Sequence, residues 1–190
     1  MEQEHIPEFT RLQNEAFVRL RAGVCRKGYL AQFRAIVLAS VEDGCAYEIL
    51  LRQNLRTIPD SSELGSRILP AICSRTIWRR SVDVEKFRDP VIRLKHGLLP
   101  LEPTIQEVQA DISLEMIRKL LSKAHTATIP AYIMHQGLGV DGTGYELILG
   151  GLFIGARFNW WCDAPAGWEP LSALFGEIRA LVDEAIVAGS

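Results

Sequence analysis

The stretch DGTGYELILG, residues 141–150, places an Asp-Gly pair directly before an alternating apolar segment. Every second residue from Tyr145 to Leu149 is a large apolar one, which is the period of a β-strand. An Asp-Gly pair between two such segments is typical of a tight hairpin turn, because glycine adopts positive φ angles at little cost. We therefore predict a hairpin whose turn contains Asp141 and Gly142.

Two further glycines precede this turn and create a motif that suggests a nucleotide site. Gly137, Gly139 and Gly142 spell G-x-G-x-x-G, the dinucleotide fingerprint. That fingerprint must open a helix, because the pyrophosphate binds at the helix N-terminus. Here a predicted strand follows the glycines. The sequence therefore assigns the glycines to a turn and predicts no cofactor.

The turn motif has a second copy in the first half of the chain. The pattern D-G-x-x-Y-E begins at Asp43 and again at Asp141, a constant offset of 98 residues, and the first copy predicts a turn at Asp43 and Gly44. Around each copy the predicted order is helix, strand, turn, strand, Trp-containing strand and helix. Two explanations stay open: internal duplication of an αβββα unit, or convergence on a favourable hairpin.

The hydrophobic pattern extends this scheme along the whole chain. It predicts helices over 8–22, 82–97 (broken or begun near Pro90), 111–125 and 171–188, and strands over 29–40, 45–54, 71–80, 131–136, 143–150 and 155–161. The fold class is α+β, with antiparallel sheet and helices mainly on one face. Residues 1–98 and 104–190 would be two αβββα halves packed as one compact body, joined at Pro100–Pro103.

Composition and charge restrict the class of protein. The 190 residues are 48% hydrophobic and 23% charged, as in globular domains. The longest apolar run is too short to span a bilayer, the start lacks a signal-peptide pattern, and four widely spaced cysteines indicate reduced thiols. The net charge is +4 over residues 1–95 and −6 over 96–190, without a charge block. We expect a cytoplasmic protein that binds neither membrane nor nucleic acid.

No catalytic or metal-binding motif stands out. The chain lacks H-x-x-x-H, H-E-x-x-H and G-x-S-x-G patterns, so we assign no catalytic residue and no metal. Glu48 and Glu146 occupy equivalent positions in the two D-G-x-x-Y-E copies. We expect solvated glutamates on the outer face of a strand, and a paired-carboxylate acid–base site is the alternative.

The tryptophans near the C-terminus are the candidate binding residues. Trp160 and Trp161 are consecutive on a strand and must point to opposite faces of the sheet. Arg157 and Asn159 share the side of Trp161, so we expect Trp160 in the core and Trp161 exposed. Trp168 either seals the edge between sheet and helix or joins an exposed aromatic platform beside Arg157. The candidate binding residues are Arg157, Asn159, Trp161 and Trp168.

The same C-terminal segment carries a resemblance. DGTGYELIL, followed by RFNWWCDAPAGWEPL and an amphipathic helix, resembles the C-terminal signature of a group of small uncharacterised bacterial proteins, some of which sit among toxin–immunity loci. The resemblance covers residues 138–180. It implies a domain and carries over no catalytic residue.

These observations favour a non-enzymatic cytosolic protein that binds a partner protein, of the immunity type by the resemblance. Two alternatives remain: a sensor that binds a small ligand between the two halves, and an enzyme whose catalytic residues the sequence does not reveal. An exposed Trp/Arg surface would favour the first, a closed apolar cavity the second, and convergent titratable groups in a cleft the third.

Overall fold

The computed structural model describes residues 6–23, 29–52, 71–89, 91, 101–130, 142–150 and 155–189. In chain order the elements are α1 (Ile6–Ala22), β1 (Tyr29–Ala39), β2 (Gly44–Arg52), β3 (Ala71–Trp78), α2 (Arg80–Arg88), β4 (Ile105–Ile112), α4 (Leu114–Thr126), β5 (Thr143–Gly150), β6 (Gly155–Trp161) and α5 (Glu169–Gly189). The strand expected over 131–136 and the residue Asp141 lie outside the described residues.

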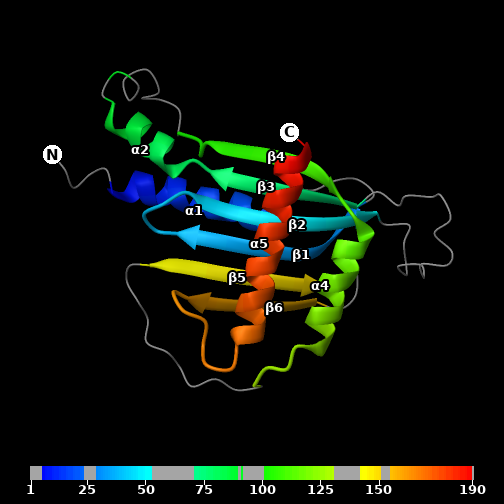
Figure 1. The fold of residues 1–190 in the computed structure, drawn as a ribbon. Coiled ribbons are helices and arrows are strands. Elements are labelled where there is room, and N and C mark those ends of the chain that lie inside the picture. Colours follow the sequence, from blue (N-terminus) through cyan, green and yellow to red (C-terminus); the bar gives the residue numbers. More distant parts are fainter. Residues whose placement is uncertain are drawn as a thin grey trace.

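The six strands form one antiparallel sheet in the order β4-β3-β2-β1-β5-β6 (Figure 1). The fold is therefore α+β, as the sequence predicts. β1 pairs with β5, and β3 pairs with β4. Strands from residues 1–98 and from 104–190 thus belong to a single sheet.

One face of the sheet carries the larger core. α5 crosses this face with α4 beside it (Figure 1), and α5 contacts β1 to β4. The odd-numbered residues of β2, and those of β1 from Phe33 onward after a register shift, point to it because side chains alternate along a strand. The buried residues of this cluster include Phe33, Ile49, Leu147, Phe175 and Ile178.

The opposite face carries α1 and a smaller core. Its buried hydrophobic residues are Ala16, Leu20, Ile36, Leu38, Ala46 and Trp78. α1 packs mainly against β1, β2 and β3. The helices thus cover both faces, and α4 and α5 cover more of the sheet than α1 does. Below, the two sides are the α5 face and the α1 face.

β4 is a strand that the sequence analysis missed. The predicted helix over 111–125 begins too early, because Asp111 and Ile112 are the last residues of β4. α4 begins at Leu114, and the Ser113 side chain caps it by accepting a hydrogen bond from the Met116 N–H at 3.3 Å. Ser113 is thus the N-cap residue of α4, whereas Asp111 belongs to the sheet.

The first Asp-Gly pair lies where the β1–β2 connection ends: Asp43 precedes β2, and Gly44 is its first residue. Asp43 Oδ1 accepts a hydrogen bond from the Ser81 N–H at 3.2 Å, which satisfies the N-terminus of α2. Gly44 opens β2 and is not among the glycines with positive φ. A Cβ built on Gly44 would lie 2.9 Å from Leu20 Cδ1, so a larger residue here would have to displace the Leu20 side chain of α1.

The structure does not show the internal duplication. β2 lies between β1 and β3, and β5 lies between β1 and β6. In a duplicated αβββα unit, the strand expected over 131–136 would pair with β5 in the way that β1 pairs with β2. In the structure, the strand that pairs with β5 on this side is β1. The repeat stays a prediction.

Candidate functional site

An exposed polar and aromatic surface lies on β6, an edge strand of the sheet. Arg157, Asn159 and Trp161 all point to the α1 face, and we call these three residues the β6 patch. All three are exposed. Because α1 packs mainly on β1 to β3, it leaves this end of the α1 face uncovered.

The two adjacent tryptophans divide as the sequence predicts. Trp160 is 9% exposed and Trp161 is 38% exposed. Trp160 stacks on Tyr145 with ring centroids 5.6 Å apart and meets Phe175 of α5 edge-on at 5.4 Å. Trp160 therefore anchors β6 from the α5 face while Trp161 points the other way.

Trp168 belongs with Trp160 and not with the β6 patch. Its ring meets Trp160 edge-on at 6.3 Å and Phe158 at 5.6 Å, both on the α5 face. This is the arrangement that seals the edge between sheet and helix. A single aromatic platform of Trp161 and Trp168 is not formed.

Glycines of the DGTG motif leave room for the Trp161 ring. A Cβ on Gly142 would lie 2.8 Å from Trp161 Nε1 and 2.6 Å from Cys162 Sγ. A Cβ on Gly144 would lie 3.5 Å from Trp161 Cε3. The sequence analysis assigned Gly142 to a turn, and the structure adds that it accommodates an indole. The close contact with Trp161 and Cys162 explains glycine at position 142 without a phosphate, whereas the contact at Gly144 is an ordinary van der Waals distance.

The residue that holds Arg157 is Glu146 of β5. Arg157 donates to Glu146 Oε2, and Arg21 Nε donates to Glu146 Oε1 at 2.7 Å. Glu146 is 5% exposed. Burial on its own would raise the pKa of Glu146, but the hydrogen bonds from Arg21 and Arg157 outweigh it and lower the pKa below its ordinary value.

A second ion pair lies beside the first on the same face. Arg34 of β1 and Glu48 of β2 face each other across the strands, with Arg34 Nε 2.6 Å from Glu48 Oε1. Glu48 is fully buried, and Arg34 also donates to the Arg21 carbonyl oxygen at 2.5 Å. We call Arg21, Arg34, Glu48, Glu146 and Arg157 the Arg–Glu cluster. It fixes the C-terminal end of α1 to the sheet.

The expectation of solvated glutamates is therefore wrong. Glu48 and Glu146 do lie on the face opposite Tyr47 and Tyr145, but arginines from β1, α1 and β6 cover them. A turn at Asp43 sets the β1–β2 register, which places Arg34 opposite Glu48. This register is the one feature of the sequence from which the Arg34–Glu48 pair could be predicted. The Arg21–Glu146 contact joins residues 125 positions apart and leaves no local signal.

The Arg–Glu cluster has limited scope for acid–base chemistry. An acid–base catalyst at neutral pH needs a pKa near the working pH, and the pKa of Glu146 is shifted the other way. Within the described part of the chain, no group of three His, Cys, Asp or Glu side chains is placed to hold a metal ion. The arrangement positions Arg157 and stabilises α1 against the sheet.

Two hollows border the described elements. One of about 780 Å³ lies between β4, the start of α4 and the end of α5. The other, of about 200 Å³, lies where the ends of β1, β5 and β6 meet, and it includes Phe33, Arg34 and Ile148. Pockets for small organic ligands usually measure about 300–1,000 Å³, so the hollow at the junction of the two halves is small for that purpose.

Comparisons with known proteins add no relative. No family model matches the chain, and neither the curated proteins nor the solved structures give a significant match. None of the described helices has the length and apolar content needed to cross a membrane.

Proposed function

We propose that this chain is a cytoplasmic protein-interaction protein that binds a partner protein through the β6 patch, in the manner of an immunity protein. One observation carries the proposal: Trp161 is exposed beside Arg157 and Asn159 on an edge strand whose other face is anchored in the core. Tryptophan and arginine dominate the residues that contribute most to protein–protein affinity.

Contacts within the unbound protein already fix the side chains of the β6 patch. Trp161 lies over Gly142 and Gly144, and Glu146 fixes Arg157. A side chain that is already ordered loses little conformational entropy on binding, which favours affinity. Two guanidinium groups, Arg21 of the Arg–Glu cluster and Arg157 of the patch, share one carboxylate, so an excess positive charge remains next to the patch. We expect a partner surface with an apolar pocket and an acidic rim.

The small-ligand sensor remains a weaker candidate. The hollow between β1, β5 and β6, where strands of the two halves meet, has a volume of about 200 Å³ and is below the usual size of a ligand pocket. The aromatic and basic composition of the β6 patch favours a macromolecular partner.

The test is site-specific photo-crosslinking in cells. A photoreactive amino acid replaces Asn159 in one variant and Val187, exposed on α5, in a control variant. A protein captured only by the Asn159 variant is then purified and titrated. Trp161→Ala should weaken its binding at least about tenfold, as expected of a central interface tryptophan, while Val187→Ala should not. Equal affinity of wild type and Trp161→Ala would contradict the proposal.

A further inference from the structure

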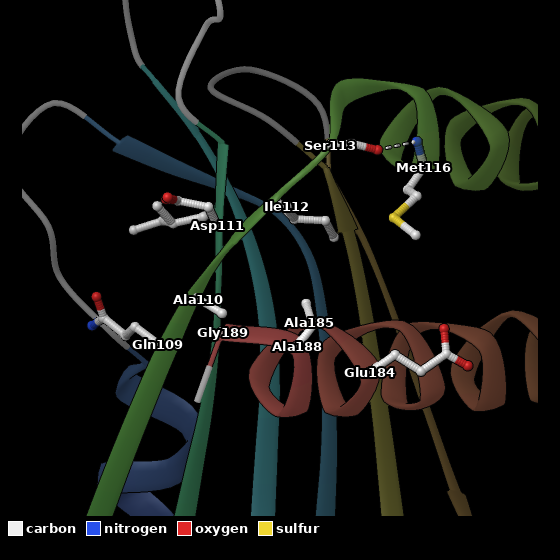
Figure 2. Close-up of a pocket in the computed structure, with 11 residues that line it drawn as sticks. Gln109, Ala110, Asp111, Ile112, Ser113, Met116, Glu184, Ala185, Ala188 and Gly189 are labelled. Atoms are coloured by element: carbon white, nitrogen blue, oxygen red, sulfur yellow. Dashed lines mark hydrogen bonds between the residues drawn. The ribbon is translucent and has the colours of Figure 1, made fainter.

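The edge of the sheet opposite β6 is formed by β4, and it borders the larger hollow. This β4 groove, of about 780 Å³, runs between β4, α4 and the last turns of α5. Figure 2 shows Asp111 and Ile112 on opposite sides of the β4 ribbon, with Ala185 of α5 on the side of Ile112, and all three residues line the groove. The hollow exists because α5 presents the small residues Ala185, Ala188 and Gly189 here.

The two faces of β4 differ sharply in chemistry. From the pairing with β3, the α5 face of β4 carries Val108, Ala110 and Ile112 after Gln106, and the α1 face carries Glu107 and Asp111 with Gln109 between them. Val108 is 40% exposed. An added strand would therefore place one set of side chains beside an apolar row and the other beside carboxylates.

Among the described residues, no ion pair reaches the carboxylates of this edge, although Gln109 Nε2 donates a hydrogen bond to Glu107. Within the described ranges, Glu107, Asp111 and Glu184 form no ion pair, and the β3 residues opposite Glu107 and Asp111 are Thr76 and Ile72. Glu184 lies on the rim of the β4 groove. A partner with basic side chains would satisfy this charge.

We propose that β4 binds an extended segment of another protein in which apolar and basic residues alternate. The segment adds a strand to the sheet, inserts apolar side chains into the β4 groove and places Lys or Arg beside Glu107 and Asp111. An edge strand leaves half of its backbone N–H and C=O groups available for such pairing, and no described strand takes them on β4.

A second copy of this chain fits the edge less well. Pairing of β4 with another β4 brings a second Glu107 and a second Asp111 to an edge that is already acidic. Pairing with β6 offers one basic residue, Arg157, which is already bound to Glu146. Charge complementarity therefore favours a different, basic partner, and this site is independent of the β6 patch.

The probe is a fluorescent peptide of about eight residues in which Lys and Val alternate, matching the length of β4. Fluorescence anisotropy measures its binding to the full chain. A Glu/Val peptide tests the charge, and a Lys/Val peptide with N-methyl groups along one edge tests the backbone pairing. We expect the Lys/Val peptide to bind and both controls to bind at least about tenfold more weakly.

Variants of the chain test the location. The triple change Glu107→Gln, Asp111→Asn and Glu184→Gln should weaken binding at least about tenfold, and Ala188→Phe, which fills the groove from an exposed position, should do the same. Glu85→Gln on α2 and Trp161→Ala should bind as the wild type. Circular dichroism checks that each variant is folded.

Three outcomes would overturn the proposal. The first is that the Lys/Val peptide does not bind or binds no tighter than its Glu/Val counterpart. The second is that the groove variants bind the peptide as well as the wild type does. The third is that the chain alone sediments as a dimer that Ala188→Phe converts to monomer, which would assign the groove to a second copy.

Discussion

The two faces of the one sheet are built from the same strands but differ in what covers them. Of the residues that the structure describes, 18 buried hydrophobic ones form one cluster on the α5 face, and α5 crosses it (Figure 1). On the α1 face the buried hydrophobic cluster has six members, and the Arg–Glu cluster lies beside it. The α5 face is a continuous apolar core, whereas the α1 face mixes core, buried charge and exposed surface.

This difference shows how a strand can serve stability and recognition at adjacent positions. Along β6, Trp160 contributes to the core and Trp161 does not, although the two are neighbours in sequence. The strand is held rigid from the α5 face, which leaves the α1 face of β6 available for binding. The predictions below test this division between the faces.

The largest effect is expected at Trp160. Trp160→Ala removes stacking on Tyr145 and edge contacts with Phe175 and Trp168, so it should lower the free energy of unfolding by about 3–5 kcal/mol. Trp161→Ala is the matched control, and it should stay within about 1 kcal/mol of the wild type. Urea denaturation followed by circular dichroism measures both. Equal losses would show that the faces do not differ in this way.

The next effect concerns the buried charge on the α1 face. Glu48→Gln leaves Arg34 without its carboxylate and should lower the free energy of unfolding by about 3 kcal/mol. Removing one partner of a buried ion pair leaves the other charge uncompensated, which strongly destabilises the fold. The double change Arg34→Met and Glu48→Leu should cost less than Glu48→Gln alone. A double variant as unstable as the single one would mean that the pair contributes net stability that apolar packing cannot replace.

Most strands and helices could be predicted from hydrophobic period and turn residues, but β4 could not. Its sequence IQEVQADI places polar residues on an exposed edge, and the strand exists through pairing with β3. Propensity and period carry no information on such a partner. The helix predicted over 82–97 ends as α2 at Arg88, just before the proline that was expected to break it.

Only those features of the candidate site that depend on the alternation of side chains along β6 could be predicted. Alternation placed Arg157, Asn159 and Trp161 together and separated them from Trp160. The placement of Trp168 depends on how the turn before α5 folds back, and the burial of Glu146 depends on Arg21 from α1. Such contacts form between segments that are distant in the sequence, so the pattern of a single sequence does not predict them.

A smaller effect is expected at the glycine beneath Trp161. Gly142→Val places its Cβ within 3 Å of Cys162 Sγ and Trp161 Nε1, so the two side chains must move. Overpacking of this kind should cost about 1–3 kcal/mol and change the fluorescence of Trp161. Gly176→Ala in α5, where a Cβ meets open space, is the control and should stabilise the fold by about 0.5–1 kcal/mol. Unchanged stability in Gly142→Val would contradict the close contact.

The smallest effect is expected at Glu146 and depends on pH. Hydrogen bonds from Arg21 and Arg157 outweigh burial and lower the pKa of Glu146 in the folded state below the unfolded value of about 4.3. A lowered pKa contributes stability above the unfolded pKa, and this contribution is lost as the pH falls through the folded pKa. Because both arginines are largely exposed, Glu146→Gln should cost less than about 1 kcal/mol at neutral pH. The difference from the wild type should shrink below about pH 4 in urea denaturation series. Parallel stability profiles of the two proteins across that range would show that Arg21 and Arg157 do not stabilise the carboxylate.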